Sequence, residues 1–220
     1  MMLLSDAQGI HVDATKYNTD LCRVCTAIAN LHAANINQGF LPSLGTRFLY
    51  ELYRCIGEHP ECFLIAEEHD GKVMGFIAGT TGKRPLRSVL LRHPFRVFTA
   101  LLLSLTNRHR IAGILEVARH VGSDHHSTKN LPRAELLSMA VDVKLRGQGC
   151  AERLFKALEA QLSHANVSAF RIVAGSSLTA ACRFYGKMGA TEIKRFQLHK
   201  GEDSIVFQKA IPTHTMGVQA

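Results

Sequence analysis

A short glycine-containing turn, Arg146-Gly-Gln-Gly-Cys-Ala151, is the part of the sequence with the clearest chemical meaning. An apolar run ending at Val143 precedes it, and an amphipathic segment, Glu152 to Leu162, follows it. This pattern predicts a strand, a tight turn and a helix. The first N–H groups of a helix have no acceptor within the helix, and the helix dipole is positive there. We therefore expect the turn to bind a phosphate or pyrophosphate group.

Hydrophobic periodicity predicts alternating strands and helices around this turn. The expected strands are 10–15, 62–67, 73–79, 135–143, 170–174, 193–198 and 204–208; the expected helices are 19–35, one with Phe48, Leu52 and Ile56 as its apolar stripe, 149–164 and 177–188. The sequence His69-Asp-Gly-Lys72 is typical of a tight turn, so the second and third strands should form a hairpin. A chain of 220 residues is long enough for one such α/β domain and short for two.

A second landmark is Ala181-Cys-Arg-Phe-Tyr185-Gly-Lys-Met-Gly189-Ala, whose Tyr185 lies about forty residues after Arg146. It is similar to Ala-x-x-Phe/Leu-Tyr-x-x-x-Gly-Phe of the GNAT acetyltransferases, and Arg146–Ala151 fits their Arg/Gln-x-x-Gly-x-Gly/Ala signature. Ala140-Val-Asp-Val resembles the strand that precedes their pyrophosphate loop. The order of elements is also similar. The resemblance is clearest over 134–209, extends to 10–80 and leaves 83–130 unexplained.

The resemblance implies a single GNAT-like α/β (α+β) domain over residues 1–211, with a mixed, mostly antiparallel sheet flanked by helices. A basic, partly helical insertion, 83–130, would precede the central strand, and 212–220 would be a flexible tail. The co-substrate would be acetyl-CoA. Backbone groups of Met139 and Val141 would contact its pantetheine arm, and its pyrophosphate would lie against Arg146, Gly147, Gln148, Gly149, Cys150 and Ala151. The acceptor amine would attack the thioester directly in a ternary complex.

Two residues are the candidates for proton transfer. By resemblance, Tyr185 is the general acid for the departing CoA thiolate; the alternative is a buried core tyrosine bonded to a backbone carbonyl. Glu135, near the start of the central strand, is the first candidate for the base, and the alternative is an ion pair with Arg133. Glu116, His125 and His126 are weaker candidates for the base.

Three residues bear on the match to the family. Leu178 stands where the family often has Asn, and Ala190 replaces the usual Phe. Cys150 occupies a variable position, which favours packing, although a thiol beside the CoA site could react. The missing Asn weakens an acceptor or CoA contact and leaves acetyl transfer less determined than CoA binding.

Positive charge is concentrated in one segment. Residues 83–129 contain nine Lys or Arg against two acidic residues, and the chain as a whole carries +8. This favours an anionic partner, or else a solvated helical face. We expect an N-acetyltransferase for a small, anionic amine such as an amino sugar.

Other functions stay open. A protein or peptide amine is the second acceptor class, since 134–143 looks similar to ribosomal-protein N-acetyltransferases. A CoA-binding module without turnover is another possibility, and so is peripheral contact with an anionic membrane through 83–129. Nucleic acid is not expected, because few aromatic residues accompany the positive charge and no binding motif is present.

The remaining composition indicates a cytoplasmic protein, because the N-terminus lacks a signal-peptide pattern and no apolar run could span a bilayer. The six cysteines are expected to be reduced. Cys22 and Cys25 have a zinc-like spacing without a second pair, so no metal is expected. A monomer or a homodimer is expected.

Overall fold

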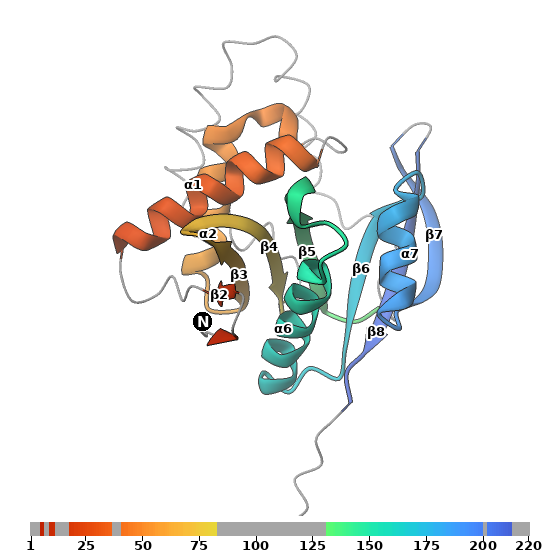
Figure 1. Ribbon diagram of the computed structural model, residues 1–220. Helices are drawn as coiled ribbons and strands as arrows, with labels where there is room; N and C mark the ends of the chain where they lie inside the picture. The colour runs from red at the N-terminus through yellow and green to blue at the C-terminus, as the bar shows by residue number, and fades with distance from the viewer. Residues whose placement is uncertain are drawn as a thin grey trace, which may run out of the picture.

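The computed structural model describes residues 5–6, 9–11, 18–36, 41–82, 131–199 and 202–212. These residues form one mixed sheet with helices on both faces (Figure 1). The strands are β1 (Ser5–Asp6), β2 (Gly9–His11), β3 (Cys62–His69), β4 (Lys72–Thr80), β5 (Ala134–Val141), β6 (Ala169–Gly175), β7 (Thr191–His199) and β8 (Glu202–Ala210). The helices are α1 (Asn18–Asn35), α2 (Thr46–Glu58), α6 (Cys150–His164) and α7 (Thr179–Lys187), with short 3-10 turns η1 (Leu41–Leu44) and η2 (Val143–Leu145).

The strands lie in the order β1-β2-β3-β4-β5-β6-β8-β7. Every neighbouring pair is antiparallel except β5 and β6. The β3–β4 hairpin turns at Asp70 and Gly71, whose φ angles are 50° and 73°. Two positive φ values match the turn that fits the twist of a hairpin. The predicted fold class, a mostly antiparallel mixed sheet with flanking helices, is confirmed.

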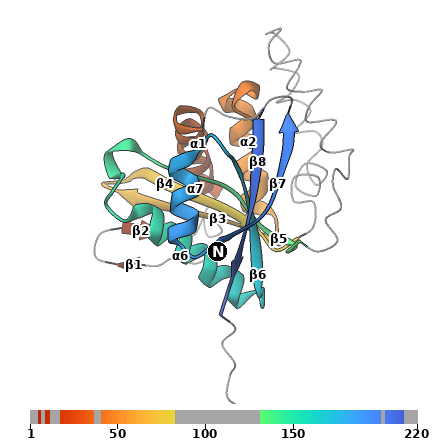
Figure 2. The same ribbon diagram turned by 90° about the vertical axis from the view of Figure 1, so that its right-hand side faces the viewer.

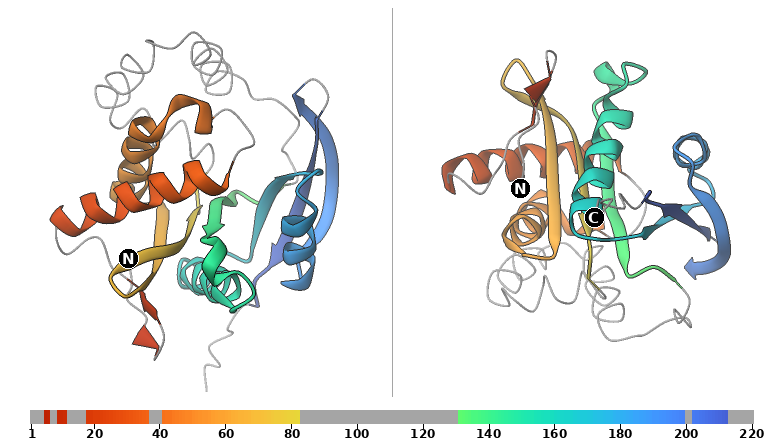
Figure 3. Two further views of the ribbon diagram at one scale, coloured as in Figure 1. Left: turned by 45° about the horizontal axis from the view of Figure 1, so that its top comes forward. Right: turned by 90° about the horizontal axis from the view of Figure 1, so that it is seen from below.

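Alternating side chains divide the sheet into two apolar faces. Leu64, Phe76 and Ala78 pack against α1 and α2, whereas Ile65 and Ile77 pack against α6. Each of these helices has an apolar stripe with helical spacing, for example Phe48, Leu52 and Ile56 in α2 and Leu154, Leu158 and Leu162 in α6. Figure 3 shows α1 and α2 together on one side of the strands and α6 on the other.

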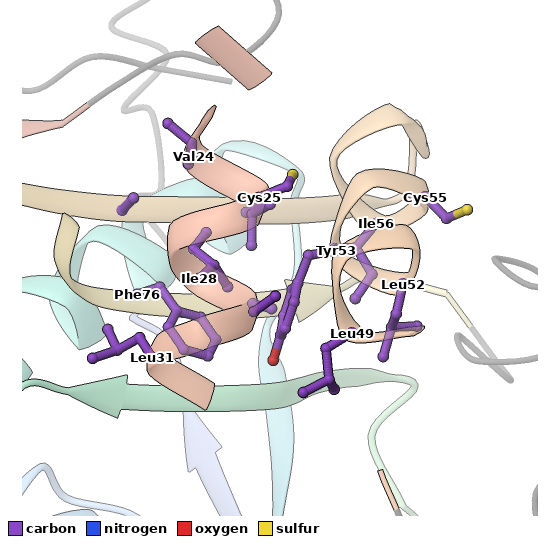
Figure 4. Packing of buried hydrophobic residues seen from close by; sticks show 14 of the residues in the cluster. Val24, Cys25, Ile28, Leu31, Leu49, Leu52, Tyr53, Cys55, Ile56 and Phe76 are labelled. Carbon is purple, nitrogen blue, oxygen red and sulfur yellow. The ribbon is translucent and has the colours of Figure 1, made fainter. Parts of the chain in front are cut away.

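The α1–α2 face has a dense core (Figure 4). Ile28 of α1, Leu49 and Tyr53 of α2 and Phe76 of β4 are almost inaccessible to solvent. The rings of Tyr53 and Phe76 meet edge to face with centroids 5.1 Å apart. This packing fixes the position of both helices on the sheet.

The parallel pair β5 and β6 separates soon after it begins. Only 134–136 of β5 pair with 170–172 of β6, after which the two strands diverge, as Figures 1 and 2 show. Along its other edge β5 has a bulge, because Leu136 pairs with Gly79 and Ser138 with Ala78, which leaves Leu137 as an extra residue. The opening between β5 and β6 is called the fork below.

The elements agree with the predicted ranges except at some ends. The central strand was predicted to reach Val143 but ends at Val141, because the Asp142 side chain accepts a hydrogen bond from the Lys144 N–H and begins η2. Val143 is 66% exposed. The first strand was predicted at 10–15, and the structure has β2 at Gly9–His11, with 12–15 outside the described residues. The basic segment 83–130 and residues 213–220 of the predicted tail also lie outside them.

Candidate functional site

The turn before α6 has a backbone conformation that requires glycine twice. Gly147 has φ 76° and Gly149 has φ 75°, both in the left-handed region. Gly149 is the N-cap of α6, and it makes no side-chain capping hydrogen bond. An added Cβ at Gly147 would have no atom within 4 Å. The surface above this turn is therefore open to a ligand.

The backbone donors of the turn divide into used and free groups. The N–H of Arg146 donates to Val143 O, and the N–H of Gln148 donates to Leu145 O. In the described part of the chain, no acceptor is recorded for the N–H groups of Gly147, Gly149, Cys150 and Ala151. The last two belong to the first turn of α6, where the helix supplies no acceptor. These four donors, rather than all six predicted residues, are available for a pyrophosphate.

An ion pair beneath the turn was missed by sequence reasoning. Arg153 of α6 donates to both carboxylate oxygens of Glu67, at 2.5 Å and 3.3 Å, and also to Gln148 O at 3.0 Å. Glu67 is fully buried on β3 and is also contacted by His69. Burial alone would raise the pKa of Glu67, but the hydrogen bonds from Arg153 and His69 hold its pKa below the usual value. The Arg153 side chain thus holds the glycine turn against the sheet.

Cys150 packs inward from the same turn. Its side chain is fully buried, and burial together with the nearby Glu67 raises the pKa of its thiol to about 12. A thiol with this pKa is not ionised near pH 7, and the thiolate is the reactive form. The packing interpretation of Cys150 is therefore favoured over that of a reactive thiol, and Cys150 contributes only its backbone N–H to the free donors.

The side chains of Arg146 and Gln148 hold the turn from outside. Arg146 donates from its guanidinium to Asn35 Oδ1 at 2.9 Å, so it reaches the last residue of α1. Gln148 donates from its amide to Lys144 O at 2.8 Å. Arg146 connects the turn to the helix layer on the opposite face of the sheet.

Backbone groups of Met139 and Val141 face the fork. The N–H of Asp142 donates to Met74 O, and 75–78 of β4 pair in register with 138–141. Because successive backbone groups of a strand point to opposite edges, Ala140 also faces β4, and Met139 and Val141 face away from it. No β6 residue pairs with β5 beyond Leu136. Both predicted residues therefore present backbone donors and acceptors to the opening between the strands.

Tyr185 is placed by α7 within an aromatic group. Its ring centroid lies 5.9 Å from that of Phe207 and 6.4 Å from that of Phe155. Burial raises the pKa of Tyr185 to about 12, so its hydroxyl keeps its proton near pH 7. In the described part of the chain its hydroxyl has no recorded hydrogen-bond partner, and the alternative of a bond to a backbone carbonyl is not seen.

The Tyr185 backbone is fixed by the end of its helix. Gly189, with φ 78°, and Ala190 close α7: the Gly189 N–H donates to Gly186 O and the Ala190 N–H to Tyr185 O. These two bonds form a Schellman motif. The stretch from Tyr185 to Gly189 in the second landmark therefore forms the C-terminal end of α7. The hydrogen bonds that close this end fix the backbone of Tyr185.

Glu135 lies on β5 beside a different arginine from the predicted one. Arg171 of β6 donates twice to Glu135 Oε2, at 2.9 Å and 2.5 Å, and the two residues are paired in register. The expected alternative partner was Arg133. Phe170 and Ile172 face α6, so the Glu135–Arg171 pair faces the α1–α2 side.

Comparisons with known proteins give the family. The family model described as "Acetyltransferase (GNAT) family" matches residues 32–190, which is most of the chain. This chain belongs to the GNAT family of acetyltransferases. The family uses acetyl-CoA, and the four free N–H donors beside the fork fit the pyrophosphate of that ligand. No curated protein sequence is significantly similar to the chain.

Several solved structures share the fold. The ribosomal-protein-S18-alanine N-acetyltransferase from Escherichia coli has 14% identity and a TM-score of 0.53, covering 93% of this chain and 96% of that one. An N-acetyltransferase from Staphylococcus aureus Mu50 has 12% identity and a TM-score of 0.54, covering 87% and 94%. Ard1 from Thermoplasma volcanium has 13% identity and a TM-score of 0.54, covering 87% and 93%. At these identities the likeness concerns the fold.

One departure from the GNAT pattern has a visible structural consequence. Leu178 is the N-cap of α7, is 37% exposed and makes no capping hydrogen bond. Asn is among the best N-cap residues and Leu among the poorest. The missing Asn therefore leaves the first turn of α7 without a side-chain acceptor.

A GNAT enzyme also needs an acceptor site, and a pocket of about 320 Å³ lies between α1 and α2. It is lined by Thr26, Ala29, Asn30, Thr46, Arg47, Tyr50 and Glu51. Glu51 Oε2 is buried without a hydrogen-bond partner in the described structure. The Glu51 carboxylate and the Arg47 guanidinium thus both line the pocket, one helical turn apart on α2.

The described ranges contain neither a metal-ligating group nor a membrane-spanning helix. No group of three or more His, Cys, Asp or Glu side chains is arranged to hold a metal ion there. None of the helices described is both long and apolar enough to cross a membrane.

Proposed function

We propose that this GNAT enzyme transfers the acetyl group of acetyl-CoA to the amine of a small, anionic acceptor. The observation that carries the acceptor class is the pocket between α1 and α2. A buried carboxylate without a partner is costly, and a hydroxyl group of the acceptor would satisfy Glu51 and leave the reacting amine free. Arg47 would pair with an anionic group of the same molecule. The positive charge of 83–129 supports the same class of acceptor.

The donor is held by the residues around the fork. The N–H groups of Gly147, Gly149, Cys150 and Ala151 bind the pyrophosphate, and Arg146 adds positive charge. The pantetheine arm follows the backbone of Val141 and Met139. This arrangement brings the thioester to the part of β5 where the fork begins.

The chemistry is a direct attack in the ternary complex. The neutral amine adds to the acetyl carbon, forming the C–N bond, and the C–S bond then breaks. Glu135 takes the proton of the amine; both Arg171 donors end on its Oε2, and a carboxylate has further acceptor sites. Tyr185 gives its proton to the departing thiolate and regains one from solvent.

The test of the acceptor class is a panel of amines assayed by release of free CoA thiol. Anionic amines such as amino sugar phosphates should turn over best. Glu51→Gln and Arg47→Gln should raise KM for the acceptor about tenfold or more, while KM for acetyl-CoA stays unchanged. Glu58→Gln, at the other end of α2, is the matched control. Equal turnover of neutral and anionic amines, with no effect of either pocket variant, would contradict this acceptor class.

A protein or peptide amine is the second candidate. The observation that favours it is the shared fold with the ribosomal-protein-S18-alanine N-acetyltransferase from Escherichia coli. Peptides with free N-termini, one acidic and one basic series, belong in the same panel. The basic segment suits an acidic acceptor better than a basic ribosomal one.

Two other functions are tested by simple measurements. A CoA-binding module without turnover would bind acetyl-CoA tightly and release no thiol with any amine. Association with an anionic membrane through 83–129 would appear as co-sedimentation with phosphatidylserine vesicles that is lost at high salt.

A further inference from the structure

A buried chain of hydrogen bonds joins α1, α2 and β5. His32 Nδ1 lies 2.5 Å from the Tyr53 hydroxyl, which in turn donates to Ser138 Oγ at 3.1 Å. His32 and Tyr53 are 2% and 1% exposed. Figure 4 shows the Tyr53 hydroxyl directed toward β5 from an otherwise apolar group. Apolar side chains of similar size could fill this volume at no cost in stability, so the polar chain calls for another explanation.

The chain has a direction, which follows from its histidine end. Burial lowers the pKa of His32 to about 4, so the ring is neutral near pH 7 and carries one N–H. Its Nε2 is buried and has no partner in the described structure. Buried N–H groups without an acceptor are rarer than buried acceptors without a donor, which places the ring proton on Nδ1. His32 then donates to Tyr53 and Tyr53 donates to Ser138, so the Ser138 hydroxyl proton is left for a third group.

Ser138 stands where the acetyl group of the donor would arrive. The pantetheine arm runs from the glycine turn back along Val141 and Met139, and the fork begins just beyond Leu136. Ser138 lies between these points. It directly follows the bulge residue Leu137, and like that residue it faces the α1–α2 side, opposite α6.

We propose that Ser138 donates its hydroxyl proton in a hydrogen bond to the acetyl oxygen of bound acetyl-CoA, and that Tyr53 and His32 are positioning residues for this donor. The inference rests on the donor half of the proposed function, the binding of acetyl-CoA at the fork. Negative charge grows on this oxygen when the amine adds to the carbon and disappears when the C–S bond breaks. Ser138 keeps its proton throughout. Such donors act by stabilising the charge that develops in the transition state.

The direct test needs no acceptor. Acetyl-CoA labelled with ¹³C at the acetyl carbonyl is bound to the full-length protein, and the infrared carbonyl band is recorded. A hydrogen bond lowers this frequency, so the wild-type band should lie below that of Ser138→Ala. Tyr53→Phe should give an intermediate band, Ser138→Thr should keep the wild-type band, and Ser204→Ala, which alters a buried serine of β8, is the matched control. The same band in the wild type and in Ser138→Ala would overturn the proposal.

Kinetics separate the positioning role from a structural one. Removal of one such donor lowers turnover roughly 100-fold. Ser138→Ala should therefore lower kcat by about this factor with KM for acetyl-CoA unchanged, and Tyr53→Phe should lower it less. The double variant should be no slower than Ser138→Ala, since Tyr53 acts through Ser138. If the losses of kcat in the two single variants add in the double variant, the positioning role is contradicted. If the wild type is inactive with every amine, the proposed acceptor is contradicted, and the infrared measurement still tests the Ser138 hydrogen bond.

Discussion

Arg153 and Glu67 connect the first turn of α6 to the buried interior of β3, with Arg153 Nη2 2.5 Å from Glu67 Oε1. The two residues are 86 positions apart. Because Arg153 also donates to Gln148 O, one side chain determines where the glycine turn lies relative to the sheet. The position of the glycine turn therefore depends on an ion pair that lies beneath it.

Arg153→Met should destabilise the protein by about 2–4 kcal/mol, because Glu67 stays buried and loses its cation. Thermal unfolding measures this effect, and isothermal titration should show weaker acetyl-CoA binding. Lys187→Met is the control: it removes an exposed ion pair with Glu152, for which less than about 1 kcal/mol is expected. Equal effects of both substitutions would refute the anchoring role.

Gly147→Ala should weaken acetyl-CoA binding about tenfold. The φ angle of 76° costs a residue with a Cβ roughly 1 kcal/mol, and the added methyl group would project into the open space above the turn. Gly186→Ala in α7 is the matched control. An added Cβ at Gly186 also has no atom within 4 Å, but Gly186 has a helical conformation that alanine adopts without strain. We expect Gly186→Ala to raise the melting temperature. Unchanged acetyl-CoA affinity in Gly147→Ala would count against a ligand over the turn.

Leu178→Asn should stabilise the protein by about 1 kcal/mol. An Asn side chain at the N-cap can accept a hydrogen bond from the first turn of α7, which Leu cannot do. Chemical denaturation of the wild type, Leu178→Asn and Leu178→Ala would measure the effect. Stabilisation by Ala as large as that by Asn would show that removal of an exposed apolar side chain, and not capping, is responsible.

Tyr185→Phe should lower kcat at least tenfold and leave the affinity for acetyl-CoA unchanged. Because burial raises the pKa of Tyr185 to about 12, the wild-type rate should not fall from ionisation of this residue below about pH 11. A pH–rate profile with direct acetyl-CoA titration checks both points. Parallel loss of kcat and binding would indicate that Tyr185 only fills the aromatic group.

Stability should depend on pH through His32. Its pKa is about 4 in the folded protein and 6.5 in an unfolded chain, so the unfolded state binds an additional proton between these values. The free energy of unfolding therefore falls as pH decreases from 6.5 to 4, by about 3 kcal/mol in total from this residue. Urea unfolding at a series of pH values measures the slope. In His32→Phe this part of the slope should vanish; an unchanged slope would assign it to other groups.

Local patterns were sufficient to predict the described helices and the hairpin, and the resemblance to the GNAT family supplied the fold class. The stripe of Phe48, Leu52 and Ile56 and the turn at Asp70 and Gly71 contain their own signals within a few residues. The glycine turn and the Tyr185 helix end were found for the same reason.

What the sequence did not reveal depends on contacts between distant segments. Glu67 lies in a strand pattern and Arg153 in a helix pattern, and nothing local joins them. The partner of Glu135 was expected nearby, at Arg133, but the register of β5 with β6 places Arg171 opposite it. The same limit applies to His32, Tyr53 and Ser138, whose chain depends on how two helices pack over β5.

The extra residue at Leu137 changes which side of the sheet the following residues face. Before it, Ala134 and Leu136 face α6, and after it Met139 and Val141 face α6 as well. In a regular strand, Leu136 and Met139 would face opposite sides, because they are three positions apart. Loss of one residue from 137–138 would restore simple alternation and leave Leu136 and Met139 on the α6 side, but it would remove one of the two adjacent side chains on the α1–α2 side. A deletion here is therefore expected to cost the Leu137 side chain or the Ser138 hydroxyl and to leave the α6 face of β5 intact, whereas an insertion would turn the residues on one side of it to the wrong face.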